Sequence, residues 1–161
     1  MTLVLRAATA GDLAQIATLH RESILQLCHE HYSAEQLTDW TAALRPEAYA
    51  ALLASHRMFV AIASDSELLG FGVLDPGQGL VNATYVHPSA VRRGVGKQLL
   101  EAMEACAKDA GRSQLQLNAT LNAITFYERC GYVSQGRTSN RLPTGVDLPC
   151  EAMQKTLVTA H

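Results

Sequence analysis

The chain has 161 residues, of which 48% are hydrophobic and 17% are charged, and its formal net charge is −2. This composition excludes a disordered or highly charged chain, and the length is typical of one domain that buries a sizeable core. The nearly balanced charge argues against broad nucleic-acid binding, which needs Lys and Arg clustered over a whole face. We therefore expect one domain over residues 1–161 that binds no nucleic acid.

The cysteines and the apolar runs bear on the cellular compartment. The four cysteines lie far apart and form no Cys-x-x-Cys pair, which argues against a zinc framework or a dithiol redox motif. The first residues lack the pattern of a signal peptide, and no apolar run approaches the ~20 residues of a membrane span. We expect a cytoplasmic protein with reduced thiols, no metal and no membrane association.

The first third of the chain predicts one strand followed by three helices. Residues 2–6 alternate as a short strand, and apolar residues then recur at helical spacing from Leu13 to about Leu27. Ser33 and Gln36 have the spacing of a capping box, which predicts a second short helix. Pro46 suits the first turn of a third helix.

The middle of the chain predicts a hairpin, a buried strand and a long helix. The apolar runs 58–63 and 68–74 flank a polar turn, and residues 80–86 form the next strand. Apolar residues then repeat every three or four positions from Val95 to Cys106, until Gly111 ends the helix.

The last third predicts two strands around a helix, and then a loop. Residues 115–117 alternate as a strand, residues 121–130 form a helix, and Tyr132 begins another strand. Two prolines and two glycines between residues 134 and 149 predict a long loop before a last strand near residues 150–158.

The junction at residues 84–100, TYVHPSAVRRGVGKQLL, predicts an anion site. A helix entered through Gly94 and Gly96 leaves its first N–H groups without intrahelical partners, and the helix dipole adds partial positive charge there. Arg92, Arg93 and Lys97 reinforce that charge, and we expect a diphosphate as the ligand. The alternative is a tight loop with solvated arginines.

Two other nucleotide-binding motifs do not fit this glycine spacing. A P-loop would need glycine at Val91 and Ser or Thr at Gln98. A dinucleotide-binding fingerprint would need a third glycine at Leu99.

Two stretches in the right order and at the right separation resemble the GCN5-related N-acetyltransferase (GNAT) superfamily. Residues 91–96, VRRGVG, resemble the Gln/Arg-x-x-Gly-x-Gly/Ala segment that holds the diphosphate of acetyl-coenzyme A, and residues 122–132, NAITFYERCGY, resemble the segment beside the thioester. Val91 departs from the pattern, which removes one side-chain contact but leaves the amides. The resemblance implies an α/β GNAT fold, with a mixed central sheet of six to seven strands flanked by helices.

The resemblance also implies roles for particular residues. Tyr127 matches the tyrosine that protonates the departing thiolate, although an ordinary packed tyrosine is the alternative. A helix-capping or surface role is the alternative for Asn122. The implied cofactor-binding residues are Tyr85, Val86, Arg92, Arg93, Gly94, Val95, Gly96, Lys97 and Asn122.

The acceptor side is less defined by the resemblance. Relatives place substrate-recognition helices between the first two strands, so His29, Tyr32 and Trp40 are candidates for the acceptor pocket, with a core position as the alternative for Trp40. Many relatives carry a Glu or His base on the fourth strand, where this chain has Asn82 and Thr84. Other candidates for the base are Glu22, His29 and His31, and none is assigned.

The implied function is transfer of an acetyl group from acetyl-coenzyme A to a primary amine by direct attack. The amine belongs to a small molecule or a peptide, and the sequence does not choose between them. The alternative is a non-catalytic acyl-coenzyme A sensor or interaction module, which the missing base would favour. A homodimer is one option, because relatives often pair through their last strands.

Overall fold

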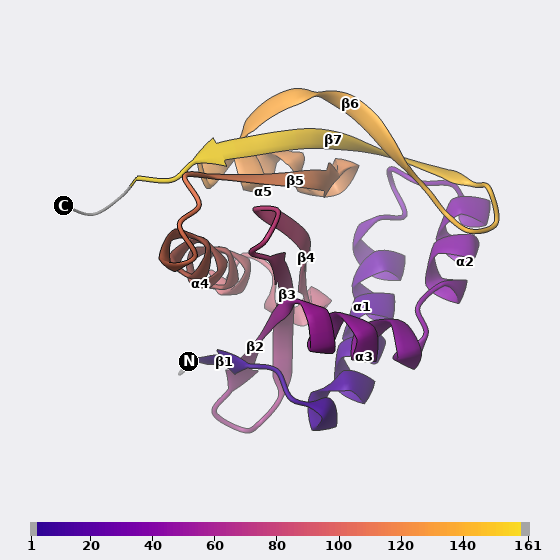
Figure 1. Ribbon diagram of the computed structural model, residues 1–161. Coiled ribbons are helices and arrows are strands. Elements are labelled where there is room, and N and C mark those ends of the chain that lie inside the picture. The colour runs from indigo at the N-terminus through magenta and orange to yellow at the C-terminus, as the bar shows by residue number, and fades with distance from the viewer. Residues whose placement is uncertain (1–2, 159–161) are drawn as a thin grey trace.

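A computed structural model describes residues 3–158, which form a seven-stranded mixed sheet with helices on both faces (Figure 1). The order of strands in the sheet is β1-β2-β3-β4-β5-β7-β6. The strands are β1 (Leu3–Ala7), β2 (Arg57–Ala63), β3 (Leu68–Asp75), β4 (Leu80–Val86), β5 (Gln114–Thr120), β6 (Val133–Arg141) and β7 (Asp147–Thr156). The helices are α1 (Leu13–Leu27), α2 (Ala34–Ala42), α3 (Pro46–Ser55), α4 (Val95–Asp109) and α5 (Ile124–Arg129). The predicted fold class is confirmed.

The local signals place most elements as predicted. The capping box at α2 is present: the Gln36 amide donates to Ser33 Oγ at 3.1 Å, and the Ser33 amide donates to Gln36 Oε1 at 2.8 Å. Pro46 is the first residue of α3. The predicted first strand included Thr2, which lies outside the described residues. The helix predicted over residues 121–130 begins instead with the 3-10 turn η3 (Leu121–Ala123).

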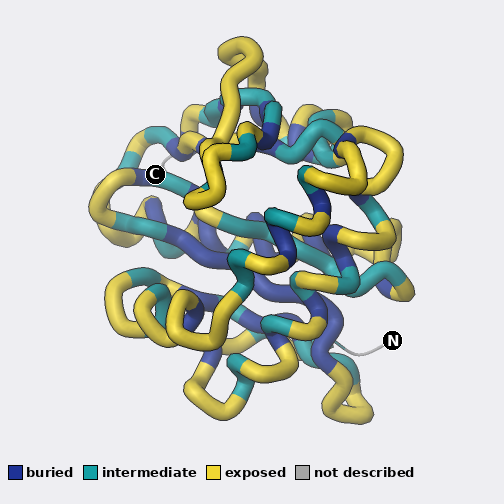
Figure 2. Tube along the Cα trace, turned by 90° about the vertical axis from the view of Figure 1, so that its right-hand side faces the viewer, coloured by how far each residue is buried: buried dark blue, intermediate teal, exposed yellow. Residues whose placement is uncertain are grey.

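Helices α4 and α1 cover opposite faces of the sheet (Figure 1). Two glycines on β3 let α4 pack closely, because a Cβ at Gly72 would lie 2.7 Å from Met103 Cε and a Cβ at Gly70 would lie 3.0 Å from Leu99 Cδ1. On the other face, α1 and α3 pack against Phe71 and its neighbours on β3. The strands between these helices are largely buried (Figure 2).

The predicted loop over residues 134–149 is wrong. Most of it belongs to the antiparallel hairpin of β6 and β7, which pairs from Val133 with Gln154 to Arg141 with Asp147. Every residue of β6 is exposed, so the strand shows no alternation of apolar and polar residues that sequence reasoning could detect. Gly136 (φ 115°) lies at an irregularity in the register, and Pro149 lies on β7 beyond the end of β5, where no bond to that strand is needed.

No helix within residues 3–158 is long and apolar enough to cross a membrane.

Candidate active site

Strands β4 and β5 separate after a short stretch of pairing, and we call the unpaired stretch between them the slot. The two strands pair in parallel only at Leu80 with Gln116 and at Val81 with Leu117. Beyond these pairs, β4 continues beside β3 alone and β5 continues beside β7 alone. Asn82 is an extra residue at a shift of register on β4, where the strand leaves its neighbour. The edges of β4 and β5 that face each other are therefore free to pair with an extended ligand.

The N-terminus of α4 follows the far end of β4. Gly94 precedes the helix with φ 80°, a conformation that favours glycine, and it has no side chain to cap the amides of Val95, Gly96 and Lys97. Gly96 must be small, because a Cβ there would lie 3.0 Å from Phe126 Cζ on α5 and 3.4 Å from Val86 Cγ2 on β4. The glycines thus bring the positive end of α4 against β4 and α5.

Arg92 and Arg93 lie exposed on the loop before α4. Arg92 adopts the left-handed conformation at φ 64°, which is uncommon outside glycine. The Arg93 Nη1 atom donates to the Ser89 carbonyl oxygen at 3.4 Å. Both arginines therefore lie on the loop that leads into the end of the helix where an anion is stabilised.

Tyr127 projects from α5 toward β4. Its ring packs edge to face against Phe126 and Tyr132, with centroids 5.0 Å and 5.8 Å away. Burial raises the pKa of Tyr127 to about 12, and the nearby Thr84 hydroxyl on β4 partly offsets that rise. Thr84 Oγ1 is buried and makes no hydrogen bond within the described chain.

Tyr85, the next residue on β4, contacts side chains of α1 on the opposite face. Its ring centroid lies 4.2 Å from that of His20 and 5.8 Å from that of Phe71. Burial, together with nearby Cys28 and Tyr127, raises the pKa of Tyr85 well above the ordinary value. The Thr84 hydroxyl therefore lies on the α5 side of β4, and the neutral phenol of Tyr85 lies on the α1 side.

The segment after α1 is bound to η3 and to β7. The Cys28 thiol donates to Asn122 Oδ1 at 3.3 Å, and burial raises the pKa of that thiol to about 12. The Tyr32 hydroxyl donates to the Pro149 carbonyl oxygen at 2.6 Å and accepts from the Leu121 amide at 3.1 Å. These bonds fix the start of η3, and with it Asn122, beside the end of α1.

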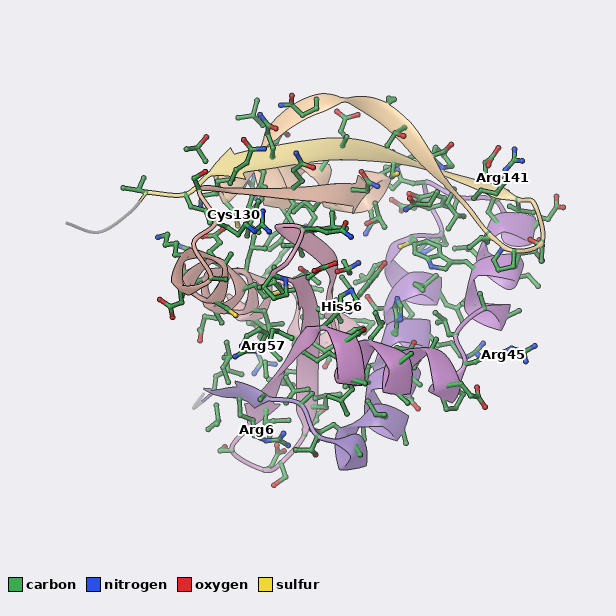
Figure 3. All side chains as sticks on the ribbon, in the orientation of Figure 1. Arg6, Arg45, His56, Arg57, Cys130 and Arg141 are labelled. Atoms are coloured by element: carbon green, nitrogen blue, oxygen red, sulfur yellow. The ribbon has the colours of Figure 1, made fainter. Side chains whose placement is uncertain are left out.

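Helix α2 is held against the hairpin of β6 and β7, where Arg141 lies (Figure 3). Gln36 Nε2 donates to the Asp147 carbonyl oxygen at 3.0 Å, and the Thr144 hydroxyl donates to Asp39 Oδ2 at 3.2 Å. Two side-chain hydrogen bonds therefore join α2 to the hairpin.

The three predicted acceptor residues do not lie together. Tyr32 and Trp40 are buried in one hydrophobic cluster with Leu148 of β7, and packing accounts for both side chains. His29 is exposed, with Nδ1 3.1 Å from the Gln26 carbonyl oxygen. Binding of the acceptor by these residues stays a prediction.

The candidate bases are also dispersed. Glu22 Oε2 lies 2.8 Å from His87 Nε2, and His31 is exposed. Glu22 and His87 line an open hollow of about 480 Å³ between α1 and the turn of β2 and β3, and neither Thr84 nor Tyr127 lines it. Sequence reasoning missed His20 and the contact between Thr84 and Tyr127. The first resembled any core position of an amphipathic helix, and the second joins residues that are distant in the chain.

Comparison with known proteins agrees with this geometry. The chain matches the family described as acetyltransferase (GNAT) domain over residues 28–147. The uncharacterized N-acetyltransferase YafP of Escherichia coli (strain K12) is 26% identical over 133 residues, which are 81% of this chain and 83% of YafP. A GCN5-related N-acetyltransferase from Rhodopseudomonas palustris is 33% identical, with a TM-score of 0.90 over 98% of this chain and 97% of that one.

The fold extends to more distant structures. The PaiA N-acetyltransferase from Thermoplasma acidophilum, solved in complex with coenzyme A, is 21% identical, with a TM-score of 0.79 over 97% of this chain and 99% of that one.

The split mixed sheet and the glycine-entered helix are shared with acyltransferases that use acyl-coenzyme A. The chain belongs to the GCN5-related N-acetyltransferase family, and it is an acetyl-coenzyme A-dependent acyltransferase. Within residues 3–158, no group of three or more His, Cys, Asp or Glu side chains is arranged to hold a metal ion.

Proposed function

We propose that this protein transfers the acetyl group of acetyl-coenzyme A to a primary amine by direct attack of the amine nitrogen. The observation that carries the proposal is the slot between β4 and β5, which runs from Tyr127 and Thr84 to the N-terminus of α4. A slot with hydrogen-bonding edges and a positive end matches an extended ligand that carries a diphosphate.

The residues around the slot fit the coenzyme. A Cβ at Gly94 would meet nothing within 4 Å, so there is space for a phosphate beside the amides of Val95, Gly96 and Lys97. Arg92 and Arg93 add charge at the same end. The coenzyme supplies the acetyl thioester, and Val86, whose main-chain groups face the free edge of β4, orients its pantetheine arm, whereas the main-chain groups of Tyr85 pair with β3.

Three protein groups support the reaction itself. The amide of Val86 polarises the acetyl carbonyl, Asn122 holds the coenzyme from η3, and Tyr127 gives a proton to the departing sulfur. Because the pKa of Tyr127 is raised to about 12, its phenol carries that proton throughout the neutral range. Burial also raises the pKa of Cys28 to about 12, which keeps its thiol protonated and unsuited to act as a nucleophile.

Substitution of Tyr127 should lower the rate of turnover without changing the affinity for acetyl-coenzyme A. We expect Tyr127→Phe to lower kcat about 100-fold, as is typical for loss of a general acid, while acetyl-coenzyme A affinity stays within about 3-fold. The measurements are free-thiol release with a panel of small-molecule and peptide amines, and calorimetry with acetyl-coenzyme A.

The matched control is Tyr49→Phe, which removes a phenol that bonds to His20 Nδ1 on the α1 face of the sheet. That variant should retain the wild-type rate. A Tyr127→Phe protein with full activity would overturn the assignment of the acid, and a wild-type protein that takes up no acetyl-coenzyme A would overturn the proposed function.

A further inference from the structure

Thr84 carries an unexplained polar atom inside the slot. Its Oγ1 atom is buried and has no hydrogen-bond partner of regular geometry among residues 3–158. An unpaired buried hydroxyl is costly, so such an atom calls for a partner that arrives with a ligand or through a small adjustment. Thr84 lies three positions beyond Val81, the last residue of β4 that pairs with β5, and so lies within the open part of the slot.

The side chain that faces Thr84 is Tyr127. The surroundings of the Tyr127 phenol are aromatic, with Phe126 and Tyr132 against its ring, and the titratable groups nearby are Cys130 on the α5 side and Tyr85 on β4. All of these are neutral at neutral pH. Among these neighbours, Thr84 is the one whose hydroxyl favours the phenolate form of Tyr127.

We propose that Thr84 is a positioning residue for Tyr127: its hydroxyl donates to the phenol oxygen and leaves the phenolic hydrogen directed into the slot, toward the sulfur of the coenzyme. This inference rests on the proposed function. The hydroxyl can donate to Tyr127 because no other hydrogen bond from Oγ1 holds it in the described chain.

The same contact assists the chemical step. As the new C–N bond forms and the C–S bond breaks, Tyr127 gives its proton to the sulfur and becomes a phenolate. The Thr84 hydroxyl then donates to a charged oxygen, and such hydrogen bonds are about twice as strong as neutral ones. The acceptor nitrogen loses one proton to water, and water returns one to the phenolate, so the protons balance.

A pair of conservative variants tests this role. Thr84→Val keeps the shape of the side chain and removes the hydroxyl, and we expect kcat for thiol release to fall about 10-fold, the size of one hydrogen bond to a charged group. Thr84→Ser keeps the hydroxyl, and we expect it to remain within about 3-fold of wild type. In a Tyr127→Phe background, Thr84→Val should cause no further loss, because Thr84 acts through that phenol.

A binding measurement gives a readout that does not require the amine to be known. Calorimetry at pH 10, about 1.5 units above the ordinary pKa of a cysteine thiol, compares coenzyme A, whose thiol is then largely ionised, with desulfo-coenzyme A. We expect wild type to prefer coenzyme A by about 10-fold, and Thr84→Val and Tyr127→Phe each to reduce this preference to about 3-fold or less. Affinity for desulfo-coenzyme A itself should not change.

The outcomes separate this inference from the proposed function. If neither ligand binds wild type, the proposed function fails. The role of Thr84 is overturned if both ligands bind and Thr84→Val keeps the full preference, if Thr84→Val lowers kcat equally with and without the Tyr127 hydroxyl, or if Thr84→Ser is as impaired as Thr84→Val.

Discussion

His20 illustrates how a single buried ring on the α1 side of the sheet affects the stability of the fold. It lies on α1 between Tyr85 and Tyr49, and its Nδ1 atom is 2.8 Å from Tyr49 Oη. Its Nε2 atom is buried with no hydrogen-bond partner among the described residues. Burial lowers the pKa of His20 to about 3, so the imidazole is neutral at neutral pH.

This depressed pKa predicts a loss of stability in mild acid. The unfolded chain binds a proton at His20 below about pH 6.5, whereas the folded chain resists it down to about pH 3. Stability from His20 is therefore complete above pH 6.5 and is lost progressively as pH falls toward 3. We expect the free energy of unfolding to drop by about 2 kcal/mol between pH 7 and pH 5 from this group.

The measurement is urea denaturation of wild type and His20→Leu at both pH values. The variant should show a much smaller drop, because leucine does not titrate. Asp12 contributes little to the drop between pH 7 and pH 5. Hydrogen bonding from Arg6 lowers the pKa of Asp12 to about 2, so its effect on stability falls at lower pH. An equal drop in both proteins would refute the role of His20.

Individual residues also mark where sequence reasoning stopped. The sequence made Trp40 and Tyr32 candidates for a binding pocket. In the structure both side chains are buried in a cluster with Leu148 of β7. The left-handed backbone of Arg92 has no signal in its residue type. In both cases the deciding partner or conformation comes from tertiary structure.

At the scale of elements, local caps and apolar periodicity were sufficient to predict the helices and most strands from the sequence. Apolar spacing gave α1 and α4 nearly at their observed bounds, because those helices bury one face, and the Ser33 box gave the start of α2, where that side chain caps the helix. Strand β6 was predicted only at its start near Tyr132, and its extension to Arg141 was missed because it buries neither face and its register depends on pairing with β7.

The capping box of α2 allows a direct test of such a local signal. Ser33→Ala removes the acceptor for the Gln36 amide, and we expect the free energy of unfolding to fall by about 1 kcal/mol. Ser55→Ala, near the end of α3, removes an exposed hydroxyl that bonds only to near neighbours, the Ala51 carbonyl oxygen and His56 Nδ1, and serves as the control, with a change within about 0.5 kcal/mol. Urea denaturation at neutral pH compares the two, and equal effects would contradict a special role for the cap.

At the scale of the whole molecule, the slot weakens the sheet that contains it. Only two residue pairs join β4 to β5, so the half of the sheet built from β1 to β4 has few backbone bonds to the half built from β5 to β7. The resemblance to a family predicted the fold that contains this split, but no periodicity in the chain indicates where two parallel strands separate. Packing of α4 against β5 and β7 supplies much of the missing connection.

A buried polar network stabilises the packing of α4 against β7. Glu104 on α4 accepts from Lys155 Nζ of β7 at 3.1 Å and 3.2 Å and from the Tyr132 hydroxyl at 2.9 Å. Lys155 Nζ also donates to the Cys130 carbonyl oxygen at 2.8 Å, near the labelled position at the end of α5 (Figure 3). One carboxylate therefore joins α4, β7 and the end of α5, although Glu104 and Lys155 are 51 residues apart in the chain.

Removing this carboxylate should therefore loosen the two halves. Glu104→Ala leaves the Lys155 ammonium and the Tyr132 hydroxyl short of partners in a largely buried position, and we expect a loss of about 3 kcal/mol in the free energy of unfolding. Glu104→Gln keeps a neutral acceptor and should lose about half as much. Glu101→Ala, exposed on the same helix, is the control and should change stability by no more than about 0.5 kcal/mol. Urea denaturation gives these values. Hydrogen exchange of the β5 amides reports the loosening directly. If the network holds the halves together, these amides should exchange faster in Glu104→Ala than in Glu101→Ala.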